Sequence, residues 1–487
     1  MRRIFCFVVF SCAAALVALP QTACAADPDL PERAKAALDN ASRFFREQVS
    51  TSGGYLWRYS ADLSKREGEG RASESMVWVQ PPGTPSVGMA FLEAYEVTGD
   101  KYCLELARDA GLCLVQGQLR SGGWDYRIEF DPARRQRYAY RVDPPREKAR
   151  NTSTLDDNAT QAALRLLMRL DEVLKFKDQQ IHEAAEFGLS SLLAAQYPNG
   201  GWPQRFDRPP DPNMYPVKKA SYPPSWSREH PRPSYSGYYT FNDNTIADTI
   251  DVMFMAAQIY GDEQYSRAAE KAGDFILLAQ MPEPQPGWAQ QYDPQMHPAW
   301  ARRFEPPSIT GGESAGILRT LMMMYRQTGN KKYIEPIPRA IEYYRRSKLP
   351  KGGLARFYEL KTNRPLYFTR DYELTYDDSD MPTHYAFKMG DWVEGVARQY
   401  KRLIETPAED LTPSRAPYRP RLSDSLEERT REVIGALDDR GAWVEEGGMK
   451  YHGADDDTRR IIDCRMFIAN LRVLSTYLAA VDSGRQG

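Results

Sequence analysis

The sequence predicts an all-α protein, an α/α toroid: an incomplete or complete barrel of helical hairpins with short irregular β pieces in its loops. Apolar residues recur at helical spacing through most of the 487-residue chain. Glycine-containing phrases that end in an aromatic residue or leucine return at intervals of roughly 65 to 90 residues, enough for two helices and their loops. The phrases are Gly53-Gly54-Tyr55, Gly122-Gly123-Trp124, Gly200-Gly201-Trp202, Gly287-Trp288, Gly352-Gly353-Leu354 and Gly441-Ala442-Trp443. An ordinary helical bundle with capping glycines is the alternative, but it needs no aromatic residue after each cap.

The individual helices are predicted from their apolar faces. Residues 181–196 show the pattern, because Ile181, Ala185 and Leu189 lie on one helical face and glycines follow the segment. The other predicted helices span residues 34–49, 88–98, 102–116, 160–174, 245–259, 264–279, 316–327, 338–346 and 459–481. Strands are expected only as short pieces, such as residues 356–360.

The first 26 residues are typical of a secretory signal peptide. Two arginines precede an apolar stretch, which ends at the small residues Ala23-Cys24-Ala25. A transmembrane anchor and a lipoprotein are the alternatives for this segment. No later segment is expected to cross a membrane. We therefore expect a secreted or periplasmic protein.

The rest of the chain is divided by composition. Residues 27–405 are predicted to form the toroid, and residues 406–420, rich in proline and arginine, a connector. Residues 421–487 are predicted to be a C-terminal helical piece that packs on the toroid. Residues 209–235, rich in proline, serine and tyrosine, interrupt the helical pattern and are expected to be a lid or a disordered insertion.

Charge and composition exclude several classes of function. The formal net charge is -2, so the chain as a whole has no attraction for nucleic acid. Outside the predicted signal peptide the cysteines are Cys103, Cys113 and Cys464, which allow one disulfide but have no metal-ligand spacing. The histidines are scattered singly, which disfavours a histidine-based zinc site or triad. We expect a monomer with no nucleic-acid or membrane partner.

Two oxygen-rich segments precede predicted helices. One contains Asp156 and Asp157, and the other contains Asp243 between two asparagines. Helix capping by Asp or Asn is the simpler explanation of either segment alone. On neighbouring hairpins of a toroid, however, the two helix starts can face each other, and carboxylates and amides are ligands for calcium. Their coincidence favours a metal site.

Two further segments combine arginines with aromatic residues. Arg302 and Arg303 lie in a proline-bounded loop beside Glu305, and the guanidinium fork matches the carboxylate of a sugar acid. A structural ion pair with Glu305 is the alternative use. Residues 354–371 interleave Arg356, Arg364 and Arg370 with aromatic rings, which suits an acidic sugar chain; a solvated surface is the alternative.

These motifs resemble those of the pectate lyases of polysaccharide lyase family 10. Thr-Leu-Asp-Asp-x-Ala-Thr, Gly-Gly-Trp-Pro-Gln, Thr-Phe-Asn-Asp-Asn, Ala-Arg-x-Phe-Glu-x-x-Ser, Gly-x-Glu-Ser-x-Gly-Ile, Ala-Arg-Phe-Tyr-Glu-Leu and Thr-Asn-Arg-Pro occur in the family's order between residues 154 and 391. The resemblance implies a helical toroid-like fold and calcium-dependent β-elimination of polygalacturonate or a related acidic polysaccharide.

The resemblance also implies roles for individual residues. Calcium would be held by Asp156, Asp157 and Asp243, and Arg302 would be the base. Arg356 and Arg370 would bind substrate carboxylates. The predicted substrate site is completed by residues of the same motifs, namely Arg303, Arg364 and Trp202.

The chain departs from the family pattern in two places. Residues 209–235 are a longer insert than expected, and Met381-Pro382-Thr383-His384 replaces an arginine-rich phrase. Both departures bear on linkage, chain length and methylation preference more than on reaction class. A glycoside hydrolase and a non-catalytic binder of acidic polysaccharide are the alternative functions. A hydrolase would recruit a pair of carboxylates, for which Asp156, Asp243 and Glu313 are available.

Overall fold

The computed structural model describes residues 28–411 and 420–485. The predicted signal peptide, residues 1–26, therefore lies outside the described residues, as does part of the predicted connector. The helices are α1 (Leu30–Phe44), α2 (Thr84–Thr98), α3 (Lys101–Gly117), α4 (Pro132–Arg135), α5 (Ala159–Val173), α6 (Gln179–Ala195), α7 (Thr245–Tyr260), α8 (Glu263–Ala279), α9 (Ser314–Thr328), α10 (Ile337–Arg346), α11 (Val393–Glu405), α12 (Asp424–Gly435) and α13 (Cys464–Arg485). A single π turn, η1 (Phe45–Val49), extends α1.

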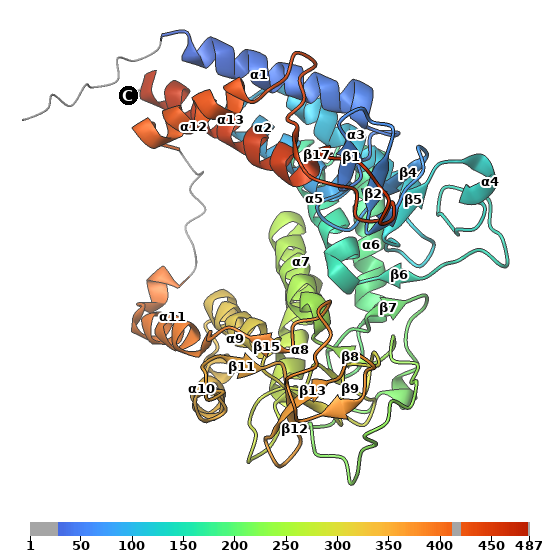
Figure 1. Ribbon diagram of the computed structural model, residues 1–487, viewed down its shortest axis with the longest axis vertical. Helices are drawn as coiled ribbons and strands as arrows, with labels where there is room; N and C mark the ends of the chain where they lie inside the picture. Colours follow the sequence, from blue (N-terminus) through green and yellow to red (C-terminus); the bar gives the residue numbers. More distant parts are fainter. Residues whose placement is uncertain (1–27, 412–419, 486–487) are drawn as a thin grey trace, which may run out of the picture.

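The helices form an inner and an outer layer that follow an arc (Figure 1). The inner helices contact one another in the order α13, α2, α5, α7, α9 and α11. The outer helices α3, α6 and α8 pack on α2, α5 and α7, α10 packs on α11, and α1 and α12 pack on α13. Figure 1 shows α11 and α13 well separated at the two ends of this series. The predicted α/α toroid is confirmed, in its incomplete form.

Short antiparallel strands line the loops between the helices. The larger sheets have the orders β16-β17-β1-β2-β3 and β10-β12-β13-β14, and the remaining pairs are β4-β5, β6-β7, β8-β9 and β11-β15. Their bounds are β1 (Arg58–Ser60), β2 (Arg66–Gly68), β3 (Gly70–Arg71), β4 (Met76–Trp78), β5 (Arg127–Glu129), β6 (Ser153–Thr154), β7 (Arg205–Phe206), β8 (Tyr239–Thr240), β9 (Gln291–Tyr292), β10 (Ser308–Thr310), β11 (Leu354–Ala355), β12 (Phe357–Glu359), β13 (Pro365–Phe368), β14 (Leu374–Thr375), β15 (Lys388–Met389), β16 (Glu445–Glu446) and β17 (Arg460–Asp463). The pairs β6-β7 and β8-β9 hold the chain just before the inner helices α5 and α7.

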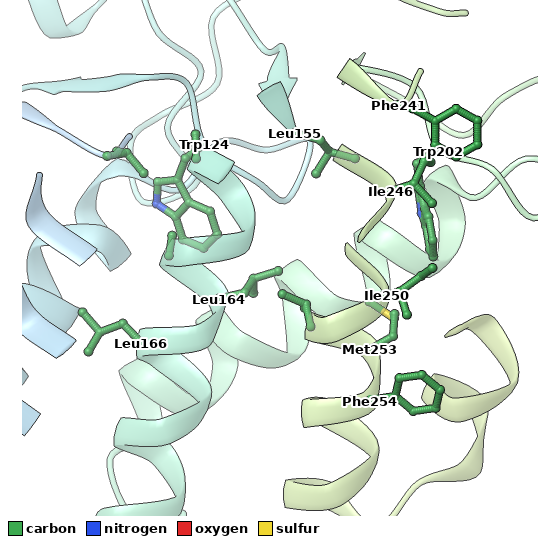
Figure 2. Packing of buried hydrophobic residues seen from close by; sticks show 14 of the residues in the cluster. Trp124, Leu155, Leu164, Leu166, Trp202, Phe241, Ile246, Ile250, Met253 and Phe254 are labelled. Carbon is green, nitrogen blue, oxygen red and sulfur yellow. The ribbon is translucent and has the colours of Figure 1, made fainter. Parts of the chain in front are cut away.

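The repeated tryptophans have a structural role. The indole N–H of each donates a hydrogen bond to a carbonyl near the end of the preceding outer helix. The pairs are Trp124 with Leu114, Trp202 with Leu192, Trp288 with Ile276 and Trp443 with Val433, at 2.8 to 2.9 Å. Figure 2 shows Trp124 and Trp202 among the buried side chains around α5 and α7. The tryptophans therefore satisfy carbonyls that the outer helices leave free, while their rings fill the core.

The glycines of the same phrases allow the close packing of successive hairpins. Gly200 has φ +98°, and a Cβ atom there would lie 1.9 Å from the carbonyl oxygen of Lys271 in α8. Only glycine can occupy such a position without displacing the neighbouring helix. Gly122, with φ +103°, meets α6 at Ser191 in the equivalent way.

We expect Gly200→Ala to lower the free energy of unfolding by roughly 2–4 kcal/mol, because the methyl group collides with fixed backbone as well as straining φ. Gly261→Ala is the matched control. Gly261 also has a left-handed φ, +70°, but has no neighbour within 4 Å among the described atoms. Its replacement should cost only about 1 kcal/mol. Equal decreases in the free energy of unfolding of the two variants, measured with urea, would show that Gly200 does not determine the contact between hairpins.

The structure differs from the predicted elements in several places. Residues 460–463, predicted as helix, form strand β17 and pair with β1. Helix α11 was not predicted, although its apolar residues lie on one helical face. Residues 209–235 contain a short 3-10 helix, Pro212–Met214. The segment is not separate from the toroid, because its backbone bonds to Leu278 and Met296. The cysteines Cys103, Cys113 and Cys464 are free buried thiols.

Helix α13 is long and apolar enough to meet the criteria for a membrane span, contrary to the sequence expectation. Half of its apolar window is buried, however, and α13 contacts α1, α2 and α12. Its apolar character is therefore explained by its place in the inner layer.

Candidate active site and metal centre

The candidate site is built from three similar turns that precede inner helices. In each turn a threonine hydroxyl oxygen accepts a hydrogen bond from the amide two residues later. The pairs are Thr154 with Asp156 at 3.2 Å, Thr240 with Asn242 at 3.0 Å and Thr310 with Gly312 at 3.0 Å. Such local bonds are the reason that threonine favours turns over helix. The turns thus place Asp156, Asn242 and Gly312 at the starts of α5, α7 and α9.

The first two turns continue as short 3-10 helices, η2 (Asp156–Asn158) and η4 (Asn242–Asn244), which contact each other. Asp157 and Asp243 have φ of 50° and 47°. Asp and Asn tolerate this left-handed region better than other non-glycine residues. The asparagines before α5 and α7 form no side-chain cap, so capping does not explain these sequences.

Three carboxylates meet where the two turns touch. Asp156, Asp157 and Asp243 each place one oxygen so that all three lie within 4.8 Å of one another. One oxygen of Asp156, Oδ1, is buried and has no hydrogen-bond partner among the described residues. Carboxylate oxygens arranged in this way suit a hard cation such as calcium, which would also satisfy the unpartnered oxygen.

The electrostatics of the cluster agree with this arrangement. Burial of the carboxyl group, followed by repulsion from Asp156, raises the pKa of Asp157 to about 6. Desolvation of the carboxyl, together with the charges of Asp157 and Asp156, raises the pKa of Asp243 to about 7. The Arg302 cation opposes both increases, so its guanidinium lies within electrostatic reach of the cluster. A bound cation would relieve the repulsion.

Tyr126 holds the other oxygen of Asp156. Its hydroxyl donates to Asp156 Oδ2 at 2.6 Å and accepts from Arg205 at 3.2 Å. Tyr126 directly precedes strand β5, and Arg205 begins β7, so two loops support the carboxylate from outside the cluster. Neither residue was predicted. A tyrosine beside a strand has no local signal that separates this role from core packing.

We expect Tyr126→Phe to weaken calcium binding about tenfold, because Asp156 loses the bond that orients it. Tyr260→Phe is the matched control, since the Tyr260 hydroxyl bonds the remote carboxylate of Asp171 at 3.0 Å. Calcium titration by calorimetry measures both variants. An unchanged affinity in Tyr126→Phe would mean that Asp156 is oriented without its hydroxyl partner.

Arg302 lies in a loop organised around the buried carboxylate of Glu305. That carboxylate accepts from Arg302 Nη2 at 2.6 Å, from the Arg302 amide at 3.0 Å and from Tyr385 at 3.0 Å. Burial by itself would lower the pKa of Arg302, but the hydrogen bond and charge of Glu305 outweigh it and raise that pKa above the usual value. The guanidinium also lies over the rings of Phe304 and Tyr385, and its side chain remains 40% exposed.

Gln290 joins the arginine loop to the metal turn. Its amide nitrogen donates to Glu305 at 2.7 Å and to Asn242 at 3.2 Å. Asn242 in turn donates to the neighbouring Asp243. One continuous set of hydrogen bonds therefore fixes the position of Arg302 relative to the acidic cluster.

Arg356 contributes a second cation near the site, beside the third turn. It pairs with Glu313 at 2.8 Å, donates to Tyr385 at 3.1 Å and lies 4.5 Å from the centre of that ring. Glu313 also accepts from Thr310. Tyr385 contacts both arginines, with Arg302 at 5.5 Å and Arg356 at 4.5 Å from the centre of its ring.

The other predicted substrate residues lie in different surroundings. Arg303 is exposed and lies over Tyr372, Arg364 lies 3.4 Å from the ring centre of Tyr376, and Arg370 is exposed and paired with Asp380 at 3.2 Å. Arg370 and Arg364 share no contact with the acidic cluster or Arg302 among the interactions of the described residues. The assignment of Trp202 to substrate binding is wrong, because its side chain is 0% exposed and its N–H is bonded within the core.

Comparison with known proteins finds a family match over the central part of the chain. Residues 118–352, just under half of the sequence, match the family model described as pectic acid lyase. This segment contains the acidic cluster and the Arg302 loop. None of the curated proteins compared matches the chain.

Several solved structures have a similar fold. One is a mutant of the family 10 polysaccharide lyase from Cellvibrio cellulosa in complex with trigalaturonic acid, with 20% identity and a TM-score of 0.45, covering 66% of this chain and 98% of that chain. D-mannose isomerase has 13% identity and a TM-score of 0.44, with 93% and 99% covered. Cellobiose 2-epimerase from Bacillus thermoamylovorans has 13% identity and a TM-score of 0.45, with 92% and 98% covered. With all three TM-scores below 0.5, these likenesses carry nothing about activity.

Proposed function

Since the match to pectic acid lyases identifies the chain as a polysaccharide lyase, we propose that it cleaves polygalacturonate by calcium-assisted β-elimination with Arg302 as the base. The observation that carries this proposal is the acidic cluster of Asp156, Asp157 and Asp243 within electrostatic reach of Arg302. Together they offer a cation site and a guanidinium to one sugar acid.

The difficulty of the reaction explains the need for these groups. The proton on C5 of a uronate is weakly acidic, and its removal leaves negative charge on the adjacent C6 carboxylate. Calcium, when bound, neutralises that carboxylate and so makes the C5 proton more acidic. Arg302 accepts the C5 proton in its neutral form, the C4–O4 bond breaks, and a double bond forms between C4 and C5. The leaving oxygen takes a proton, and no water enters the products.

The base role of Arg302 demands an alkaline medium. An arginine pKa lies above ~12 in water, and Glu305 raises that of Arg302 further. Sequence reasoning required neighbouring cations that would favour the neutral guanidine, whereas the direct partner of Arg302 is an anion. Arg356 is a second cation that contacts the same Tyr385 ring, but it is itself paired with Glu313. We therefore expect the rate to rise with pH well above neutrality.

The decisive experiment incubates the full-length mature protein with polygalacturonate, with calcium or with a chelator, and follows ultraviolet absorbance. Elimination creates a conjugated double bond that absorbs, whereas a glycoside hydrolase would release reducing ends without absorbance. A non-catalytic binder would retain the polymer and release nothing. No absorbance under either condition would refute the proposed reaction.

Calcium affinity should depend strongly on pH. The raised pKa values of about 6 for Asp157 and about 7 for Asp243 mean that calcium must displace protons below neutrality. We expect binding at pH 5 to be roughly 10²- to 10³-fold weaker than at pH 8. By the same linkage, these groups lower the stability of the metal-free fold as pH rises from about 4 through about 7. Calcium should therefore raise the thermal midpoint more at pH 8 than at pH 5, and equal increases would contradict the assignment.

We also propose that the protein is exported and acts as a monomer. The export proposal is supported by the composition of residues 1–26, which resembles a signal peptide. Mass spectrometry of the protein recovered from its native host would detect a mature chain that starts near residue 26, and an intact first residue would exclude cleavage. Light scattering in solution tests the monomeric state.

A further inference from the structure

A pocket of about 620 Å³ lies beside the Arg302 loop and takes part in none of the roles described above. Its walls include Arg303 and Trp300 from that loop, Tyr372 and Glu373 from the segment before β14, and residues 228–232 from the long insert. The volume falls within the range of about 300–1,000 Å³ typical of small-molecule sites. The pocket is therefore large enough for a sugar residue.

The insert is fastened to the Arg302 loop where it forms the wall. A ring nitrogen of His230 lies 3.0 Å from the carbonyl oxygen of Ala301, and the Trp300 indole N–H donates to the carbonyl of Ser227 at 2.9 Å. The His230 and Trp300 rings also meet edge to face. Both contacts involve the two residues just before Arg302, so the pocket adjoins the Arg302 loop.

Two of the arginines that line the pocket have N–H donors without a partner among the described residues. Arg303 gives one N–H to the carbonyl of Asp371 at 2.8 Å, and its remaining donors have no partner among the described residues. Arg232 is exposed and likewise lacks an ion-pair or hydrogen-bond partner in the part of the chain that the structure describes. Arg228, by contrast, is paired with Glu359 at 2.8 Å. Arg232 and Arg303 are therefore the guanidiniums available to a ligand.

The remaining groups define the class of ligand. Glu229 and Glu373 also line the pocket, so its charge is mixed and not simply positive. A mixed lining suits a ligand that carries both a carboxylate, for the guanidinium forks, and hydroxyl groups, for the glutamates. A bare anion such as phosphate would gain nothing from the glutamates. A uronic acid residue has both kinds of group.

Building on the proposed function, we propose that this pocket is a distal subsite that binds a uronate residue of the same chain beyond the bond that is cleaved. Arg303 follows Arg302 directly, so one substrate chain can meet both arginines with successive or nearby sugars. The insert, through Arg232, then makes the enzyme prefer chains longer than a dimer. Each carboxylate bound by an arginine fork adds affinity without touching the reacting atoms.

Calorimetric titration of digalacturonate and hexagalacturonate into the full-length protein, in chelator to prevent turnover, tests the subsite. We expect Arg232→Ala to weaken hexagalacturonate binding about threefold and Arg232→Ala with Arg303→Ala about tenfold or more, with digalacturonate unaffected. Arg208→Ala, which removes an exposed arginine just before the insert, is the control and should change neither affinity. Arg232→Lys should restore only part of the loss, because an ammonium lacks the planar fork.

Equal affinities of the wild type and the double variant for hexagalacturonate would overturn the subsite, as would equal losses for both ligands or failure of the wild type to bind the hexamer. Arg232 is exposed, so its variants test the proposal even if Arg303→Ala perturbs the loop. The readout is independent of catalysis. Length-dependent binding without unsaturated product would support the subsite and refute elimination. Formation of unsaturated product together with binding that does not depend on chain length would support elimination and refute the subsite.

Discussion

Arg302→Ala is expected to lower kcat for unsaturated product by at least about 10³-fold, the largest effect of any single substitution considered for this protein. Arg302 is the only predicted catalytic base, and its guanidinium acts on the charges of Asp157 and Asp243. Glu305 accepts a hydrogen bond from Arg302, and Gln290 donates to Glu305, so the guanidinium is held in place. Initial rates in saturating calcium, measured by absorbance from pH 7 to pH 11, provide the test.

The pH profile separates two roles for this arginine. A base contributes through its neutral form, so the wild-type rate should climb about tenfold per pH unit across the alkaline range. A guanidinium that only binds the substrate carboxylate acts in its charged form and would give a flat profile. Arg267→Ala, which removes an exposed arginine of α8 paired with Glu263, is the control and should keep full activity. An Arg302→Ala enzyme within tenfold of wild type would exclude the base assignment.

Asp243→Asn is expected to abolish calcium-dependent activity. It should stabilise the fold in the absence of calcium and destabilise it, relative to the wild type, in the presence of calcium. The amide keeps the shape of the side chain but removes a ligand charge, so calcium affinity should fall more than about 100-fold. In chelator at pH 8, however, the variant should melt about 1–3 °C above the wild type. The reason is that the raised pKa of Asp243, about 7, shows its ionised form to be disfavoured in the folded protein.

Thermal unfolding of the wild type and of Asp243→Asn, each with chelator and with calcium, measures this change in relative stability. With calcium the wild type should become the more stable protein, because only it retains the complete cluster. Asp248→Asn is the control: Asp248 lies in α7 but pairs with Arg165 at 3.1 Å and is outside the cluster. A variant that is destabilised equally in both conditions would indicate that Asp243 has a structural role and not a metal-binding one.

Most helices could be predicted because their signal is local. Apolar residues at helical spacing mark α3, α6, α7, α8 and α9 within a few residues of their observed ends, and glycine caps α7 and α9. Helix α11 was missed although Val393, Val396 and Leu403 recur at helical spacing. The strand β17 was mistaken for helix because its pairing with β1 joins opposite ends of the sequence.

The candidate metal site was also accessible to sequence reasoning, and for a similar reason. Asp156, Asp157 and Asp243 occur in two related turns, each with a threonine two residues before the start of its 3-10 helix that shapes it. A repeated fold then brings equivalent positions together. Tyr126 and Gln290, in contrast, have no pattern around them that distinguishes support of a site from packing.

By itself the sequence determined the helical repeat and the oxygen-rich turns, because spacing and turn chemistry act over a few residues. Only the tertiary structure decided which side chains meet. It buried Trp202 in the core as a partner of a helix carbonyl and set the anion Glu305 against Arg302. It also joined the 209–235 insert to the arginine loop through His230 and Trp300. These contacts connect segments far apart in the chain, so burial and charge are settled only when the hairpins pack.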